Sequence, residues 1–291
     1  MNHFAMLETM GVVRVSGPDA RAFLQGQLTA DLRKLSPAAG ALAAWCNPQG
    51  RVLFLAFLAM QGDDFLLFLP SSEIERCVKR LRMYVLRAKV TVTDLQAEWC
   101  VAGLLANDAG DGAAFTSKPV AELLWLSLPG AGLSLLAGPK ADVEAWLARE
   151  AHLPVTELDW NARALEAGLP RVEGPTTERF LPQQLNLDRL GVMSFDKGCY
   201  PGQEVIARLK YRGQVRQRLR IGSSASALQP GQRLYRAEAG AGQNAGEVLQ
   251  VVAVDGIWRC TAVIDIDCTE PLFAEAPGGI RVDFAPPSAG D

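Results

Sequence analysis

A cysteine in a glycine-containing run carries the strongest chemical signal in this sequence. Cys199 lies within KGCYPGQEVIAR, residues 197 to 208. Pro201 suits the first position of a helix, because its φ is preset and its missing N–H would have no partner there. The positive end of such a helix, together with the charge of Lys197, would favour the thiolate of Cys199. We therefore predict that Cys199 is nucleophilic or redox-active, assisted by Lys197; the alternative is a small buried cysteine that only packs.

The run K-G-C-aromatic-x-G-Q-E resembles the signature of the YgfZ family of folate-binding proteins, which is related in fold to the glycine-cleavage T-protein, an aminomethyltransferase. The similarity continues through GPDARAFLQGQLTADL at 17 to 32, NPQGRVL at 47 to 53, RLRMYVLRAKV at 80 to 90 and RFLPQQLNLDRLGVMSFDKGC at 179 to 199. The resemblance implies a bacterial protein that binds tetrahydrofolate. It also implies support of iron–sulfur cluster assembly or repair in client enzymes, including some that modify transfer RNA.

A folate site needs an acceptor for the adjacent N–H donors of a reduced pterin, and one carboxylate can accept both. Glu166, in RALEAGLPR, is the candidate, because the aminomethyltransferases have a similar RLEAG run whose glutamate supplies this carboxylate. Its alternative is an exposed helix residue. Arg208 is the preferred cation for the glutamate tail, since it shares a helical face with Gln203 and Glu204. The other predicted contacts are Asn47, Arg51, Gln184, Asn186 and Tyr200. For Gln184 and Asn186, turn hydrogen bonding is the alternative.

Three functions stay open from the sequence. The preferred one is a tetrahydrofolate-dependent accessory protein for iron–sulfur clusters. The runner-up is a folate-dependent one-carbon transferase, but the turn NPQGR at 47 to 51 has no aspartate where the aminomethyltransferases carry a catalytic one, which argues against aminomethyl transfer.

The third function is an RNA-binding module, suggested by two basic segments. Six basic and no acidic residues occur from Arg76 to Lys89, and again from Arg208 to Arg220. The second segment has no interleaved aromatic residue besides Tyr211, and Arg216, Arg218 and Arg220 alternate as the outer face of a strand does. We therefore expect no direct nucleic-acid binding.

Composition describes an ordinary globular protein. The 291 residues are 49% hydrophobic and 21% charged, with a formal net charge of −3. The start of the chain does not read as a secretory signal, and the longest apolar stretch, 52 to 60, is too short to span a bilayer, so we expect a cytoplasmic protein without a membrane partner. Six cysteines without CxxC spacing and only two histidines predict no resident metal.

Hydrophobic periodicity predicts an α+β fold. Strands are expected at 12–17, 41–46, 51–60, 65–69, 88–94, 98–104, 122–128 and 132–137. Helices are expected from Pro18 to Leu32, from a capping box at Ser72 and Glu75, from Pro139, and over 157–167. Short strands follow Gly213.

The resemblance and this pattern together predict antiparallel sheets with covering helices, in the folate-binding fold of the T-protein, followed by a small C-terminal β-barrel. We expect a folate-binding region of two interleaved subdomains over 1–213, the barrel over 214–285 and a flexible tail over 286–291.

Overall fold

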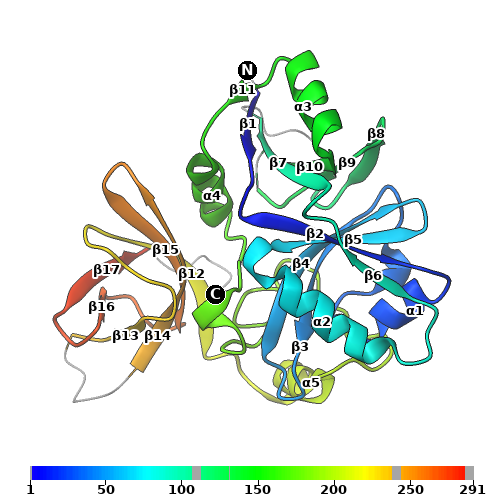
Figure 1. Ribbon diagram of the computed structural model, residues 1–291. Coiled ribbons are helices and arrows are strands. Elements are labelled where there is room, and N and C mark those ends of the chain that lie inside the picture. The colour runs from blue at the N-terminus through cyan, green and yellow to red at the C-terminus, as the bar shows by residue number, and fades with distance from the viewer. Residues whose placement is uncertain (1, 107–112, 131, 238–243, 286–291) are drawn as a thin grey trace.

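The computed structural model describes the chain except residues 1, 107–112, 131, 238–243 and 286–291, so the predicted tail lies outside the described residues. Two sheets and a barrel make up the fold (Figure 1). The expected α+β class, with antiparallel sheets, covering helices and a C-terminal barrel, is confirmed. The predicted domain boundaries stay predictions.

The first sheet has the order β3-β4-β5-β2-β6 and the second the order β11-β1-β7-β10-β9-β8. The first contains β2 (Met10–Ser16), β3 (Ala41–Cys46), β4 (Val52–Gln61), β5 (Asp64–Pro70) and β6 (Thr91–Asp94). The second contains β1 (His3–Met6), β7 (Trp99–Leu105), β8 (Ser117–Val120), β9 (Leu123–Ser127), β10 (Leu133–Pro139) and β11 (Leu153–Pro154). The chain thus passes back and forth between the two sheets.

The helices and the two sheets form layers. The helices are α1 (Ala20–Gln25), α2 (Ile74–Val85), α3 (Lys140–Arg149), α4 (Glu157–Glu166) and α5 (Gln203–Arg212). One hydrophobic cluster joins α1 and α2 to a face of the first sheet, and another joins α3 to a face of the second. The remaining faces of both sheets share the largest cluster, to which α4 contributes Trp160 and Ala164. Because successive side chains of a strand point to opposite faces of the sheet, one strand contributes residues to both clusters.

The barrel closes from six strands in the order β12-β15-β14-β13-β16-β17. They are β12 (Gln217–Ser224), β13 (Arg233–Tyr235), β14 (Asn244–Val254), β15 (Ile257–Asp265), β16 (Leu272–Ala274) and β17 (Ile280–Phe284). The expected solvated row of arginines on β12 is wrong at Arg220, which is only 9% exposed. Its guanidinium donates to the carbonyl oxygens of Cys268 and Ala285. Buried carbonyl groups without a partner are costly, which accounts for a cation at this position.

Two helix predictions need correction. The helix expected up to Leu32 ends at Gln25, because Leu28 forms a bridge to Trp45 and Thr29 exchanges hydrogen bonds with Ala44 beside β3. A 3₁₀ turn, η1 (Leu32–Lys34), follows.

The capping box expected at Ser72 is absent, because the Ser72 hydroxyl donates instead to Glu173 Oε2 at 2.9 Å. A 3₁₀ turn, η2 (Ser71–Glu73), leads directly into α2. The predicted apolar stripe of α2 is confirmed at Ile74, Cys77, Val78 and Leu81.

Candidate ligand-binding cavity and cysteine loop

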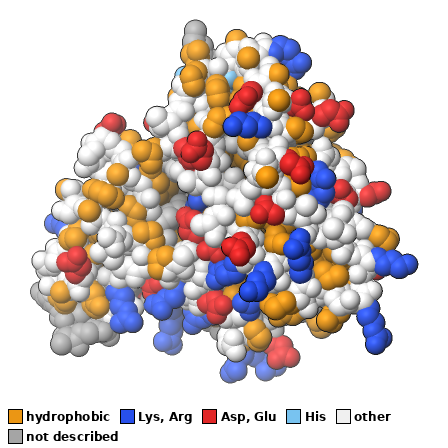
Figure 2. Space-filling model, in the orientation of Figure 1, with side chains coloured by type: hydrophobic (Ala, Val, Ile, Leu, Met, Phe, Trp, Pro, Cys, Tyr) orange, Lys and Arg blue, Asp and Glu red, His pale blue; other side chains and the backbone are white. Residues whose placement is uncertain are grey.

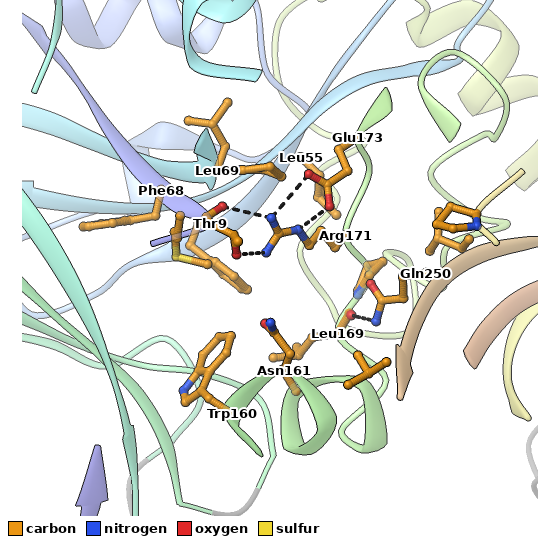
Figure 3. A pocket seen from close by; sticks show the side chains of 18 of the residues that line it. Thr9, Leu55, Phe68, Leu69, Trp160, Asn161, Leu169, Arg171, Glu173 and Gln250 are labelled. Atoms are coloured by element: carbon orange, nitrogen blue, oxygen red, sulfur yellow. Dashed lines mark hydrogen bonds and ion pairs between the residues drawn. The ribbon is translucent and has the colours of Figure 1, made fainter. Parts of the chain in front are cut away.

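A cavity of about 220 Å³ lies where the first sheet, α4 and the barrel meet (Figure 3). The sheet supplies apolar walls from β3, β4 and β5, α4 supplies Trp160 and Ala164, and β14 supplies Leu249 and Val251. The polar side chains that line it are Thr9, Asn161, Arg171, Glu173 and Gln250. Mostly apolar walls with a few polar groups are typical of a small-molecule site.

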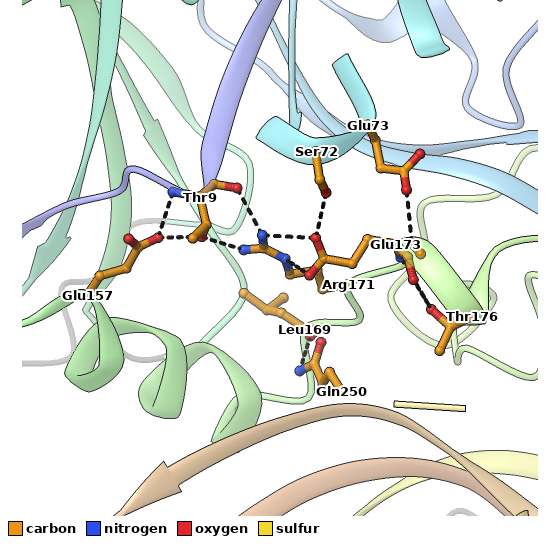
Figure 4. Close-up of polar contacts among 10 residues, drawn as sticks. Thr9, Ser72, Glu73, Glu157, Leu169, Arg171, Glu173, Thr176 and Gln250 are labelled. Carbon is orange, nitrogen blue, oxygen red and sulfur yellow. Dashed lines mark hydrogen bonds and ion pairs between the residues drawn. The ribbon is translucent and has the colours of Figure 1, made fainter. Parts of the chain in front are cut away.

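Arg171 ties the segment after α4 to the first sheet. Its guanidinium donates to Thr9 Oγ1 at 3.0 Å, to Thr9 O at 2.9 Å and to both carboxylate oxygens of Glu173, the closer at 2.7 Å (Figure 4). Glu157, at the start of α4, accepts from the backbone N–H groups of Glu8 and Thr9, each at 3.1 Å. The charge of Arg171 is already paired with Glu173, so its role here is structural. Its bonds to Thr9 and Glu173 hold the wall of the cavity in place.

Two amide side chains present groups without a partner at the cavity. Gln250 Nε2 donates to Leu169 O at 3.2 Å, which fixes the amide and leaves its buried Oε1 without a partner within the described residues. Asn161 points from α4 into the cavity in Figure 3, and its side chain has no hydrogen bond to any described residue. A buried acceptor without a partner costs free energy that a bound donor would recover.

Cys199 lies exposed on the loop that leads into α5. The helix begins at Gln203, two residues later than Pro201 predicted, with Gly202 as its N-cap. Gly202 has a φ of +79°, and a Cβ there would lie 2.5 Å from Asn47 O. Glycine is therefore required at this position. The loop of residues 197–202, which we call the cysteine loop, packs tightly on the 47–51 turn. Cys199 is not among the residues that line the central cavity.

Lys197 anchors the cysteine loop to the segment that follows α1. Its side chain is buried, with Nζ donating to Leu28 O at 2.6 Å and to Ala30 O at 2.8 Å. Burial lowers the pKa of Lys197 to about 8, and the charge of Asp31 opposes this effect. Its ammonium also lies 5.2 Å from the centre of the Tyr200 ring. The hydrogen-bond partners of Lys197 are thus backbone carbonyl groups and not the sulfur of Cys199.

Tyr200 and Gln203 complete the turn before α5. Tyr200 is buried, its hydroxyl has no partner within the described part of the chain, and burial raises its pKa above the usual range. Gln203 Oε1 accepts from the Tyr200 N–H at 3.3 Å. Glu204 and Arg208 are exposed on α5. None of these four residues lines the central cavity, and their roles toward folate stay predictions.

Two other predicted contacts lie toward the barrel. Arg51 and Gln184 line a second, polar cavity of about 420 Å³, whose wall includes the ion pair of Arg179 with Glu247. Asn47 holds its own turn, because Oδ1 accepts from Arg51 N at 2.9 Å.

Asn186 joins the chain to the barrel. Its backbone has a φ of +59°, and its Nδ2 donates to Leu219 O at 2.9 Å. Gln184 makes a similar bridge, donating to Gln217 Oε1 at 3.2 Å. These two bonds reach β12 and differ from the turn bonding that the sequence offered as the alternative. Gln184 also makes such a turn bond, because its Oε1 accepts from Leu181 N at 2.9 Å. The folate contacts of both residues stay predictions.

Glu166 lies at the end of α4 and does not line the central cavity. Its carboxylate forms an ion pair with Arg259 of β15, and its side chain is 40% exposed. This partner comes from the barrel, so the sequence around Glu166 gave no sign of it.

Arg171, Gln250 and Asn161 were missed by the sequence reasoning. Arg171 directly follows the helix stop Gly168-Leu169-Pro170. A charged residue at that position, close to a predicted helix, was the signal that could have indicated its role. Gln250 interrupts an apolar strand, which is a similar sign. Asn161 gave no signal beyond its place on the helix.

The described residues contain no group of three or more His, Cys, Asp or Glu side chains placed to hold a metal ion. Within the same residues, none of the helices has the length and apolar character needed to cross a membrane.

Comparison with solved structures shows that the whole fold is similar to that of an aminomethyltransferase. The glycine cleavage system aminomethyltransferase T from Bartonella henselae superposes with a TM-score of 0.72, covering 97% of this chain and 84% of that one, at 15% sequence identity. At this identity the likeness establishes the fold alone. Residues 5–110 also match the family described as the GCVT N-terminal domain.

Curated relatives carry the name tRNA-modifying protein YgfZ. The protein from Klebsiella pneumoniae is 30% identical over 304 residues, covering 98% of this chain and 93% of the relative. The protein from Cronobacter sakazakii is 30% identical over 86% of this chain and 80% of the relative. The protein from Edwardsiella ictaluri is 36% identical over 71% of this chain and 66% of the relative. Together with the fold, these similarities establish that the chain belongs to the YgfZ family.

Proposed function

We propose that this protein binds tetrahydrofolate in the central cavity and supports the assembly or repair of iron–sulfur clusters in client enzymes, with Cys199 as its reactive residue. The name of its relatives, tRNA-modifying protein, makes enzymes that modify transfer RNA the first clients to test. The observation that carries the folate part is an apolar cavity with an unpartnered amide oxygen in its wall.

The residues present fit a reduced pterin. Its flat ring suits the apolar walls between Phe68 and Leu249, and its N–H donors need acceptors. Gln250 Oε1 and the amide of Asn161 supply them without the desolvation cost of a free carboxylate. Glu166 is the alternative acceptor, and it would first have to leave Arg259. Bound tetrahydrofolate supplies a carrier for one-carbon units.

The exposed sulfur of Cys199 suits contact with another macromolecule. Its loop is held at one end by the buried ammonium of Lys197 and at the other by Gly202 against the 47–51 turn. A thiol on a fixed loop can lose its proton and bind iron as a thiolate, or it can take the outer sulfur of a donor persulfide, which leaves as a thiol. It can also take a one-carbon unit from a folate nitrogen, which regains a proton as it leaves. Lys197 acts in this proposal as a positioning residue.

The test is calorimetric titration of the protein with tetrahydrofolate under anaerobic conditions. Asn161→Leu and Gln250→Leu keep the side-chain size and remove the acceptors, so each should weaken binding by about 5-fold to 150-fold. Glu166→Gln, which lies outside the cavity lining, is the matched control and should bind as the parent does.

Three results would change the proposal. Loss of binding in Glu166→Gln alone would identify Glu166 as the acceptor in place of the two amides. Absence of any tetrahydrofolate binding by the parent protein would refute the folate part. Steady turnover of folate with a methylamine donor would indicate a one-carbon transferase.

A further inference from the structure

Two basic segments that are far apart in the sequence lie close together in the fold. One is on and after α2 and the other is on α5, and Figure 1 shows both helices in the lower part of the molecule. We call their exposed cations the basic face: Lys79, Arg82, Arg87, Lys89, Arg208, Lys210 and Arg212.

The end of β3 brings the two helices together. The Tyr84 ring of α2 packs edge-on against Trp45 of β3, with ring centroids 5.6 Å apart. The turn that follows β3 carries α5, because a Cβ at Gly50 would lie 3.3 Å from Val205 Cβ. α2 therefore contacts β3 near its end, and α5 contacts the turn that follows β3. Figure 2 shows Lys and Arg side chains gathered over the lower half of the molecule, where these helices lie.

The charge of the basic face is largely uncompensated. Within the described residues, none of its seven cations forms an ion pair with an acidic side chain. The exposed acids on the same helices are Glu75 and Glu204. In a chain whose formal net charge is −3, this concentration of cations creates a local positive potential that attracts a polyanion.

Exposed aromatic rings accompany these cations. Tyr84 is 44% and Tyr211 is 65% exposed. Lys210 Nζ lies 3.8 Å from the centre of the Phe195 ring, and Tyr211 packs edge-on against the same ring. The second basic segment has Tyr211 as its one interleaved aromatic residue, and the fold adds Tyr84 of α2 and Phe195 of the segment before Cys199. Cations with exposed rings are the pattern of a surface that binds backbone phosphates and stacks unpaired bases.

We propose that the basic face binds RNA, with its cations on backbone phosphates and with Tyr84 and Tyr211 stacked on unpaired bases. RNA bound there would lie beside Cys199, because the cysteine loop leads directly into α5. This reverses the expectation from the sequence that nucleic acid does not bind directly. It goes beyond the proposed function and does not depend on folate binding.

The test uses an unmodified transfer-RNA transcript as the probe and fluorescence anisotropy at several KCl concentrations. The variant Lys79→Glu/Arg87→Glu/Arg208→Glu reverses three charges of the basic face. Each lost phosphate contact lowers the slope of log affinity against log salt by about 0.7 to 0.9, so the triple variant should lose about 2 to 3 from this slope.

A matched control variant, Lys118→Glu/Lys140→Glu/Arg149→Glu, changes the net charge equally on β8 and α3, and should keep the parent slope. Tyr211→Ala should weaken binding by about 5-fold to 150-fold, with an unchanged melting temperature. If the triple variant does not fold, the Tyr211→Ala variant still tests the proposal.

Three results would overturn the inference: no binding of the transcript at low salt, equal losses in the two triple variants, or full affinity in Tyr211→Ala. Absence of RNA binding would assign the basic face to an acidic protein partner. Folate titrations are unaffected by these outcomes, so the two proposals fail separately.

Discussion

The buried ammonium of Lys197 makes the stability of this protein depend on pH in a defined direction. Burial lowers the pKa of Lys197 from 10.5 to about 8, whereas the unfolded chain keeps the ordinary value. Between these two values the folded protein binds fewer protons than the unfolded chain. The free energy of unfolding therefore rises with pH between these two pKa values. At lower pH, Lys197 is protonated in both states and contributes no pH dependence.

The size of the effect follows from the gap between the two pKa values. The full gap corresponds to about 3 kcal/mol, at about 1.4 kcal/mol per pH unit. At about pH 9.5 the protein has gained about 2 kcal/mol of this stability relative to about pH 7. Lys197→Met removes the titrating group, so the variant lacks this gain.

The assay is urea unfolding of the parent and of Lys197→Met at both pH values, with a reductant present. The difference in free energy of unfolding between parent and variant should grow by about 2 kcal/mol from the lower to the higher pH. The exposed Lys118→Met serves as the control, and its difference from the parent should stay constant. A Lys197→Met difference that is equal at the two pH values would refute the assignment of a buried, weakly basic lysine.

Two further predictions concern the cysteine loop. Cys199→Ala should fold, keep its stability within about 0.5 kcal/mol and bind tetrahydrofolate as the parent does, because the side chain is exposed and lies outside the cavity lining. The same variant should fail to restore iron–sulfur enzyme activity in a bacterium that lacks its own family member, and full restoration would exclude a reactive role. Gly202→Ala should lower the free energy of unfolding by about 1 to 3 kcal/mol more than Gly191→Ala does. Both glycines have positive φ, but only a Cβ at 202 meets backbone atoms, so equal losses in thermal melts of the two variants would contradict the tight packing on the 47–51 turn.

Local sequence patterns predicted the elements of this fold well. The apolar strands 41–46, 51–60 and 65–69 appear as β3, β4 and β5, and the stripe on α2 is buried as expected. The helix ending before Gly168 and the short strands of the barrel were also predicted correctly. Such features depend on residues close together in the chain, whose spacing alone determines which side chains share a face.

The motif around Cys199 was also readable from the sequence, because proline and glycine restrict the local backbone. It indicated an exposed cysteine on a loop before α5, and the structure places it there. The motif could not show that Lys197 turns inward to Leu28 and Ala30, since those carbonyl groups belong to a segment far back in the chain.

The sequence by itself determined most of the secondary elements, the short strands after Gly213 and the loop before α5, because each follows from neighbouring residues. The tertiary structure decided how distant residues meet: Glu166 pairs with Arg259, Gln250 and Asn161 reach one cavity from the barrel and α4, and α2 and α5 pack at the end of β3 and on the turn after it. These contacts join segments with large sequence separation. Periodicity sets which side of an element is buried, but it does not set which other element covers that side.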